Sequence, residues 1–318
     1  MRNLNIGILG PGRVAHRFAV ACKNLENINL WSICARDISK AKSFAENHHV
    51  VAPISVYDDV DVFLSDPNLH AVIIATPDIN HTQYAIKAAE KGKHLLIEKP
   101  ICTEIEEAKA IVNIVKATRV VCSIGYHLRW HAGLRKLASN LHENKYGEIY
   151  HMDIHWAHAF IDEAKWRKSH ATSKWWSLTT LGTHSLDIAR WYLVPLCGEV
   201  IESKVITTNT HYHQTDEASL ISLKFASGTT ASIYSSILFS SSLNFNIYTQ
   251  NGLITGKELT GPFTERSISV NNEKLEFTCE SNLYEKEIYD LYTSILQSRS
   301  PEVTAQAGLY NIMCMTGY

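Results

Sequence analysis

The chain of 318 residues is 45% apolar and 19% charged, with 30 Lys and Arg against 32 Asp and Glu and a formal net charge of −2. This length suits two domains of ordinary size, and the apolar fraction is sufficient for folded cores. The near-neutral charge argues against a basic surface for nucleic acid or an anionic membrane. No apolar run approaches the length of a membrane span, and no signal peptide is recognisable, so we expect no membrane partner.

The seven cysteines are odd in number and scattered along the chain, and they form no C-x-x-C pair. Most lie in apolar runs, as Cys34 and Cys122 do, so we interpret them as small buried hydrophobic residues. This usage argues against a disulfide framework and predicts a protein of the reducing cytoplasm.

The first 125 residues alternate between two periodicities. Helical patterns separate short apolar runs that are typical of buried parallel strands, and these runs lie at 4–9, 30–35, 71–76, 94–98 and 120–125. Gly92 predicts the end of one helix, and Thr103 with Glu106 predicts a capping box at the start of the next. Strands and helices alternating with short links predict a doubly wound parallel sheet.

The pattern changes after about Gly147. Residues 148–158 alternate like a strand, a helix is expected over about 177–193, and 199–257 hold four or five strand-like segments with little helix. A last helix pattern covers 283–298. We therefore predict a Rossmann-type α/β domain over 1–122 and an α+β domain over 123–318. The second should have an open, mainly antiparallel sheet with helices on one face, and a cleft should separate the two.

Gly10-Pro11-Gly12-Arg13-Val14-Ala15 has the pattern G-x-G-x-x-A, after an expected strand and at the start of an expected helix. Glycines at such a turn let the backbone approach a pyrophosphate, whose charge is stabilised by the N-terminus of the helix. An ordinary tight turn is the alternative. The position at the first strand–helix junction favours dinucleotide binding.

The end of the second strand bears on the choice of dinucleotide. Sites selective for NAD usually place an acidic residue there to bind the ribose 2′-hydroxyl. Here Ala35 takes that place and Arg36 follows, which suits the 2′-phosphate of NADP. We therefore expect NADP as the preferred cofactor and NAD as the other candidate. The alternative is that Arg36 is a solvated loop charge and that Asp37 only caps the next helix.

Glu98-Lys99-Pro100 ends a buried strand, where ligands bind in a doubly wound sheet. The proline permits a cis peptide bond, and a lysine beside an oxidised nicotinamide can take or give a proton. From these residues alone, a surface ion pair at the strand end explains the tripeptide equally well.

These motifs together resemble the Gfo/Idh/MocA oxidoreductases, which also have a run like Ala75-Thr76-Pro77-Asp78-Ile79-Asn80-His81. Residues 125–130 are similar to the link between the two domains of that family, and residues 182–187 to a helix of its second domain. The stretch from Ala35 to Ala41 is most similar to NADP-using members such as dimeric dihydrodiol dehydrogenases.

The resemblance implies a dehydrogenase that moves a hydride between nicotinamide C4 and a secondary alcohol or carbonyl of a sugar, cyclitol or related cyclic polyol. Lys99 would relay the proton of the reacting oxygen, and His184 would lie opposite it across the cleft. The dinucleotide would be bound by Gly10, Gly12, Arg13, Val14, Arg36, Thr76, Pro77, Asn80, His81, Glu98 and Lys99. The substrate would be bound by His127, Arg129, Trp166, Arg167, Thr180 and His184.

The sequence departs from the family beside the helix histidine. Many members have an Asp four residues before it, where this chain has Thr180, and Lys174-Trp175-Trp176 replaces a glycine-rich stretch. A threonine can hydrogen-bond the histidine but, unlike a carboxylate, cannot stabilise its protonated form. We therefore expect Lys99 to take a larger part in the proton transfer. A core histidine is the alternative for His184, and Asp187 is better explained as structural. The tryptophans could line a ligand or pack between the domains.

Two other functions stay open: an NAD-dependent glycoside hydrolase that works by transient oxidation, and a non-catalytic sensor of dinucleotide or sugar. No metal site is expected, because His151, His155 and His158 have no further ligands at suitable spacing. The apolar, hydroxyl-rich stretch 235–248 predicts an exposed sheet face that suits a homodimer or homotetramer. A monomer with a covered sheet is the alternative.

Overall fold

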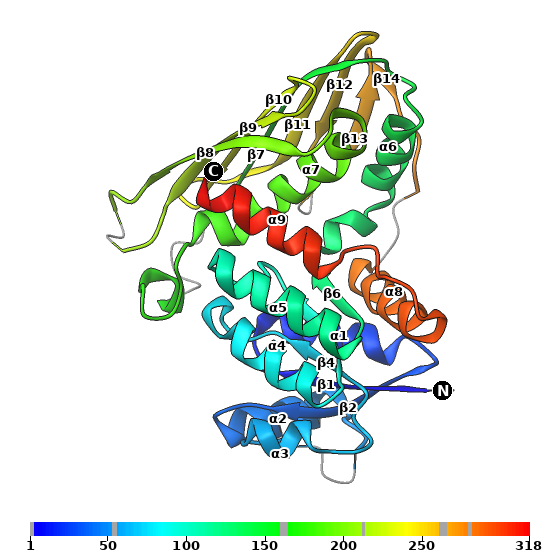
Figure 1. Ribbon diagram of the computed structural model, residues 1–318, viewed down its shortest axis with the longest axis vertical. Helices are drawn as coiled ribbons and strands as arrows, with labels where there is room; N and C mark the ends of the chain where they lie inside the picture. Colours follow the sequence, from blue (N-terminus) through cyan, green and yellow to red (C-terminus); the bar gives the residue numbers. More distant parts are fainter. Residues whose placement is uncertain (1–2, 53–55, 160–164, 212–213, 261–265, 279–281) are drawn as a thin grey trace. The chain divides into compact units, whose positions relative to one another are not determined.

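The computed structural model describes residues 3–52, 56–159, 165–211, 214–260, 266–278 and 282–318 (Figure 1). The chain divides into two compact units. The first comprises Met1–His127 with Asn282–Ile312, and the second comprises Leu128–Ser281 with Met313–Tyr318. Each unit is described by itself.

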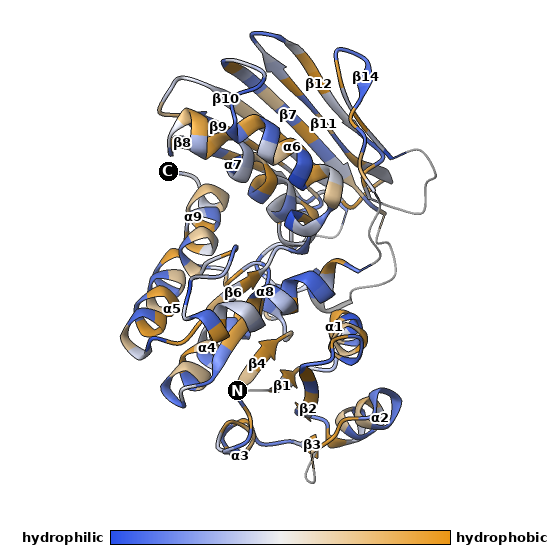
Figure 2. Cartoon of the chain, turned by 90° about the vertical axis from the view of Figure 1, so that its right-hand side faces the viewer, coloured by the Kyte–Doolittle hydropathy of each residue, from blue (hydrophilic) through white to orange (hydrophobic). Residues whose placement is uncertain are grey.

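The first unit is built on a six-stranded sheet with the order β3-β2-β1-β4-β5-β6, in which every neighbouring pair is parallel. Its central strands are buried on both faces and are coloured as hydrophobic in Figure 2, as a sheet covered on both sides requires. The predicted doubly wound sheet is confirmed. Its strands are β1 (Leu4–Leu9), β2 (Ile28–Cys34), β3 (Val56–Tyr57), β4 (Ala71–Ile74), β5 (His94–Glu98) and β6 (Cys122–Gly125).

The helices of the first unit complete its core. They are α1 (Arg13–Lys23), α2 (Ile38–His48), α3 (Val60–Leu64), α4 (His81–Glu90), α5 (Ile105–Thr118) and α8 (Leu283–Gln297), with the turn η1 (Asp78–Asn80) before α4. The sequence-based division after residue 122 assigned α8 to the other domain. In the structure α8 packs on α1, because Tyr284, Ile288 and Leu291 share a core with Phe18. Helix α9 (Ala305–Thr316) runs across the boundary between the units.

Two helix-end predictions had different outcomes. The backbone N–H of Gly92 donates to the Ala89 carbonyl at 2.9 Å just after α4, which confirms the predicted end of that helix. The predicted capping box was wrong, because α5 is preceded by Glu104 and no side-chain bond caps it. Thr103 is buried one position too early for that role.

The second unit is built on an eight-stranded sheet with the order β14-β13-β12-β11-β7-β10-β9-β8. Only the pairing of β10 with β7 is parallel among the described strands, so the predicted mainly antiparallel sheet is confirmed. The strands are β7 (Ile149–Ala157), β8 (Val200–Thr208), β9 (Ala218–Phe225), β10 (Thr230–Ser236), β11 (Ser241–Thr249), β12 (Gly252–Lys257), β13 (Ser267–Val270) and β14 (Glu273–Lys274).

Helices cover one face of this sheet. Helix α7 (Thr183–Cys197) packs on β7 and β10, and α6 (Ala132–His142) packs on α7. A single turn of π-helix, η4 (Leu178–Gly182), precedes α7, so the helix expected over about 177–193 is regular only from residue 183. The strands alternate between buried apolar and outward polar residues, which Figure 2 shows as alternating colours.

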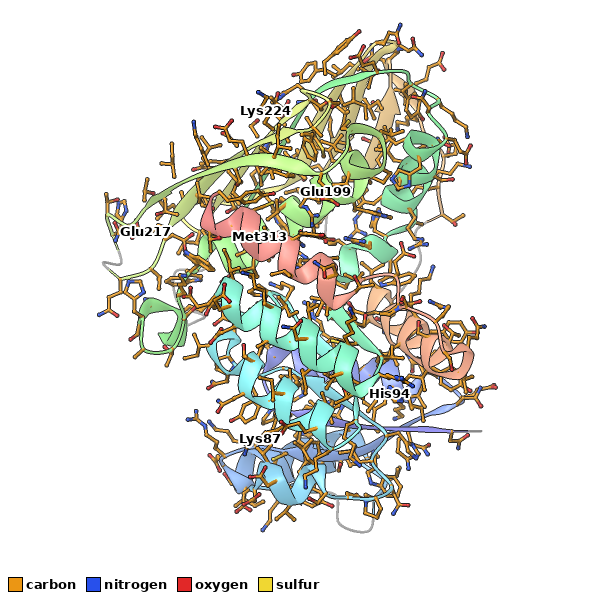
Figure 3. All side chains as sticks on the ribbon, viewed as in Figure 1. Lys87, His94, Glu199, Glu217, Lys224 and Met313 are labelled. Atoms are coloured by element: carbon orange, nitrogen blue, oxygen red, sulfur yellow. The ribbon has the colours of Figure 1, made fainter. Side chains whose placement is uncertain are left out.

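In the stretch 235–248, for which an exposed sheet face was predicted, inward and outward residues alternate, and Phe239 and Tyr248 are among the exposed large hydrophobic residues. Because strand residues alternate between faces, Phe245 and Ile247 point into the core, while Asn246 lies outward and donates to Asp153 of β7 at 3.1 Å. Lys224 projects from β9 on this exposed side (Figure 3).

The six described cysteines are buried and form no disulfide, as predicted, while Cys279 lies outside the described residues. Burial raises the pKa of the Cys22, Cys34 and Cys122 thiols to about 12. Within the described ranges, no helix is both long and apolar enough to cross a membrane.

Candidate functional site

The candidate dinucleotide site lies at one edge of the first sheet. Its strands are parallel, so their carboxyl ends share this edge, and the strand order reverses direction between β1 and β4. The glycine turn follows β1, the Thr76 loop follows β4, Lys99 follows β5 and Tyr126 follows β6. The topology therefore brings together segments that are far apart in the chain, from Gly10 to Tyr126.

The glycine turn is shaped for close backbone approach. Gly10 has φ +99°, and a Cβ at this position would lie 2.9 Å from the Ala75 carbonyl oxygen and 3.1 Å from Thr76 Cγ2. Gly12 precedes α1 with an extended backbone, and no side chain caps the helix. No side-chain cap therefore occupies the N-terminus of α1, where exposed Arg13 and half-buried Val14 lie and where a pyrophosphate would bind. These features fit the dinucleotide that the motif predicts.

The two charged residues after β2, Arg36 and Asp37, have different surroundings. The carboxylate of Asp37 accepts from the hydroxyl of Ser39 and from the backbone N–H of Ser39 at 3.0 Å, and it caps α2. These hydrogen bonds, that of the hydroxyl first, lower the pKa of Asp37. Ala35 is buried, whereas Arg36 is exposed and is bonded to no other residue that the structure describes. Capping thus occupies Asp37, and Arg36 is left as the side chain at this position that can meet a ligand.

His81 is placed differently from the prediction that it lines the dinucleotide. Its ring is buried, with Nδ1 2.9 Å from the Pro100 carbonyl oxygen and Nε2 3.0 Å from the Thr76 carbonyl oxygen. Burial lowers the pKa of His81, and the charge of Asp78 opposes this shift. The ring therefore joins the loop after β4 to the turn after β5. Neighbouring Asn80 is half-buried and accepts from Gln83 Nε2 at 2.8 Å, and Thr76 and Pro77 are also half-buried.

The turn after β5 holds Glu98 and Lys99. The peptide bond between Lys99 and Pro100 is cis. The buried Glu98 carboxylate accepts from the Lys99 backbone N–H at 3.2 Å, and its side chain lies against the end of β6, where a Cβ on Gly125 would be 3.3 Å from Glu98 Oε1. The ammonium-bearing side chain of Lys99 is half-buried at the same edge.

His127 and helix α8 contribute ionisable groups next to this turn. The His127 ring stacks on Tyr284 with a centroid distance of 4.8 Å and an interplanar angle of 18°. Burial, together with the charges of Lys99 and Arg17, lowers the pKa of His127 to about 3. His127 is therefore neutral at pH 7. His127 was predicted to bind substrate, but Tyr284 was not predicted as a site residue. The sequence pattern around Tyr284 indicated only a helix with one apolar face.

In the second unit, His184 and Thr180 lie on either side of the change from π- to α-helix. His184 is 3% exposed, and its ring centroid is 5.8 Å from that of Trp156. The carboxylate of Asp216 accepts from the backbone N–H groups of Trp176 at 2.6 Å and Leu178 at 2.8 Å, which fixes the start of the π-turn. Burial raises the pKa of Asp216 to about 6. The sequence analysis missed Asp216, which carries no local motif.

The structure describes only some of the tryptophans expected to line a ligand or to pack between the domains, together with Arg167. Arg167 donates from Nη1 to Thr179 Oγ1 at 2.9 Å, so it supports the π-turn. Trp176 is fully buried and packs with Leu181 and Ile237, which makes it a core residue of the second unit. The side chain of Trp166 lies outside the described residues.

Arg129, expected to bind substrate, forms a buried ion pair instead. Its Nε and Nη2 atoms each donate to the Asp187 carboxylate at 2.7 Å, and the two residues are 7% and 1% exposed. The guanidinium carbon also lies 5.6 Å from the Trp191 ring centroid. This geometry indicates a structural role for both charges and argues against the predicted substrate contact.

No group of three or more potential metal ligands occurs among the described residues. His151, one of the three strand histidines, is hydrogen-bonded to Thr230 across neighbouring strands.

The folds and motifs of the two units define an NAD-binding oxidoreductase class, and comparison with known proteins gives the family. Residues 4–126 match the model of the oxidoreductase family with an NAD-binding Rossmann fold, and residues 134–255 match the GFO/IDH/MocA C-terminal domain. The chain belongs to the Gfo/Idh/MocA oxidoreductase family, which confirms the resemblance stated from the motifs.

Individual relatives are more distant. A levoglucosan dehydrogenase of Pseudarthrobacter phenanthrenivorans is 29% identical over 208 residues, which are 61% of this chain and 52% of that protein. The NAD⁺-dependent scyllo-inositol 2-dehydrogenase of Bacillus subtilis is 46% identical over 67 residues, or 21% of this chain and 20% of that protein. The chain thus spans about half the length, or less, of these two relatives. An aldose-aldose oxidoreductase of Caulobacter crescentus, solved with glycerol, has a TM-score of 0.87 at 20% identity, covering 98% of this chain and 95% of that one.

The buried pair predicts a large stability effect. Asp187→Ala leaves the Arg129 charge buried without its carboxylate, and we expect the free energy of unfolding to fall by about 3–5 kcal/mol. Urea unfolding followed by circular dichroism measures this change. The control is Glu202→Ala, which removes an exposed ion pair with Lys204 and should cost at most about 1 kcal/mol. The double variant R129M/D187L should recover most of the loss, and equal losses in D187A and E202A would contradict the structural assignment.

Proposed function

We propose that the protein is an NAD(P)-dependent dehydrogenase or reductase that acts on a secondary alcohol or carbonyl of a sugar, cyclitol or related cyclic polyol. One observation supports this proposal above all: the glycine turn, the Thr76 loop and Glu98-Lys99-Pro100 all lie at the same edge of the first sheet. The family supports the reaction class, and the names of the levoglucosan and inositol dehydrogenases support the substrate class.

The bound nicotinamide dinucleotide would supply the hydride acceptor or donor. The first-turn N–H groups of α1 would bind its pyrophosphate, and Glu98 would border the ribose next to the nicotinamide. Lys99 would hydrogen-bond the reacting oxygen and take or return its proton. Neutral His127 adds no second positive charge beside Lys99, and we propose His184 in the second unit as the other proton-handling residue.

We also propose that the protein works in the cytoplasm and assembles as a homodimer or homotetramer through the second sheet. Its free, buried cysteines support a reducing compartment. Exposed Tyr150, Tyr248 and Leu253 support an interface on the sheet, and light scattering of the purified protein would report the mass. A monomeric mass would exclude this assembly.

A substrate panel tests the reaction class. Sugars, inositols, dihydrodiols and keto-sugars are incubated with oxidised or reduced NADP and NAD, and nicotinamide absorbance is followed. We expect a substrate-dependent change in absorbance with at least one sugar-like compound. Release of sugar without net absorbance change would favour the hydrolase that uses transient oxidation, and ligand binding without either signal would favour a sensor.

Arg36 tests the preference for NADP. Because its exposed guanidinium can pair with a 2′-phosphate while Asp37 is occupied as a cap, we expect NADPH to bind more tightly than NADH. Arg36→Ala should weaken the binding of NADPH by about 2 kcal/mol, or roughly 30-fold in affinity. The affinity for NADH should stay nearly unchanged. Fluorescence titration measures both affinities, with Lys42→Ala, an exposed charge of α2, as the matched control. Equal or reversed affinities in the unmodified protein would refute the preference.

Lys99 tests the proton transfer. Lys99→Ala should lower turnover by at least about 10²-fold, the contribution expected of a positioned proton-transfer group. Steady-state kinetics on the best substrate of the panel measures the loss, and Lys91→Ala, which removes an exposed charge after α4, is the control. A rate near that of the unmodified protein would assign the proton transfer to another residue.

A further inference from the structure

Glu287 is a buried acid that the proposed mechanism does not use. It lies on α8, is 1% exposed, and both of its carboxyl oxygens are buried without a hydrogen-bond partner among the residues that the structure describes. Helix α8 packs on β5 and β6, the two strands whose ends carry Glu98 and Tyr126. The acid therefore lies in the wall of the first unit next to the candidate dinucleotide site.

Two carboxylates among the described residues act on Glu287. One is Glu98 at the end of β5, and the other is Asp290 on α8. Asp290 also forms an ion pair, in which its Oδ1 lies 2.7 Å from Arg299 Nη2. Burial in the first place, and then these two carboxylates, raise the pKa of Glu287 well above its usual range.

Arg17 of α1 contacts Tyr284, a neighbour of Glu287 on α8. The Arg17 guanidinium lies 5.7 Å from the ring centroid of Tyr284, which also stacks on His127. An ionised carboxylate that is buried without donors is costly, so the neutral acid is the favoured form of Glu287.

We propose that Glu287 keeps the Glu98–Glu287 pair at a single negative charge, and that it thereby sets how strongly the site prefers the cationic oxidised cofactor over the neutral reduced one. This inference rests on the proposed function, because it requires Glu98 to border the nicotinamide. Glu287 acts here through Glu98 and is a positioning residue. When Glu287 ionises at high pH, the second negative charge favours the oxidised form.

The first arm of the test concerns protonation and needs no cofactor. A raised pKa in the folded state means that the native protein binds more protons than the unfolded chain, so stability falls as pH rises from about 4.5 towards the folded-state value. Glu287→Gln is neutral at every pH and lacks this loss. The melting temperature of E287Q minus that of the unmodified protein should therefore increase as the pH rises from about 5, until Glu287 ionises in the folded protein. Glu90→Gln, at an exposed position of α4, should show no such trend.

The second arm concerns the cofactor. Over the pH range in which the first arm shows Glu287 to ionise, we expect the affinity of the unmodified protein for NADP⁺ relative to NADPH to rise on the order of tenfold, the size of effect that one added charge near the ring would have at an effective dielectric constant of about 20. In E287Q this ratio should stay constant. If E287Q does not fold, Glu287→Leu, which replaces the acid with an apolar side chain, serves in both arms.

The outcomes separate the two proposals. A melting-temperature difference that is constant with pH would overturn the assignment of a protonated Glu287. A difference that widens, combined with an unchanged cofactor profile in E287Q, would overturn its action on the site. Failure of the unmodified protein to bind either cofactor would overturn the proposed function together with the cofactor arm, while the stability arm would still decide the protonation.

Discussion

The parallel alignment of β1, β4, β5 and β6 is the constraint on which the candidate site depends. Parallel strands end at a common edge, and the reversal of strand order between β1 and β4 keeps helices from covering that edge at one point. The glycine turn, the Thr76 loop and Lys99 have no local reason to meet. They meet because hydrogen bonding between strands places the residue after each strand in the same row.

The alignment of the strands does not by itself hold the loops that leave this edge. In the first unit the buried ring of His81 connects two of them through the carbonyl groups of Thr76 and Pro100. In the second unit Asp216 does the equivalent for the π-turn, since its carboxylate receives two backbone N–H groups that a regular helix would leave without acceptors. In both units, a buried polar side chain forms hydrogen bonds with backbone groups of an irregular segment. Without it, those buried N–H or C=O groups would lack a partner from regular secondary structure.

The sequence predicted the parts of the structure that depend on local patterns. Five of the six strands of the first sheet, the glycine turn and the mainly antiparallel second sheet each follow from periodicity or from glycine placement within a few residues. The short strand β3 was not predicted, because two residues show no periodicity. The packing of α8 on α1, the pairing of Arg129 with Asp187 and the role of Asp216 depend on contacts between residues far apart in the chain. No local pattern distinguishes a guanidinium that meets a substrate from one that meets a carboxylate 58 positions away.

The capping box was mispredicted, and the exposed face expected from the stretch 235–248 could not be assigned residue by residue, for the same physical reason. Each was inferred from the types of residue in a stretch, whereas the outcome was decided by position within one or two residues. Helix α5 begins one position later than the capping box requires, so Glu104 precedes it, and Thr103 is buried. Along β11, alternation sends Phe245 inward and Asn246 outward.

Two buried acids show how the same composition can support opposite electrostatic arrangements. Asp187 receives two charged hydrogen bonds from Arg129, so its ionised form is compensated where it lies. Glu287 receives no hydrogen bond from a described residue and faces the charges of Glu98 and Asp290, so burial favours its neutral form. A formal net charge of −2 counts both acids as ionised and hides this difference. The charge that a ligand meets at the sheet edge is set by which acids find donors in the fold, and that depends on α8 returning to the first unit more than 150 residues after β6.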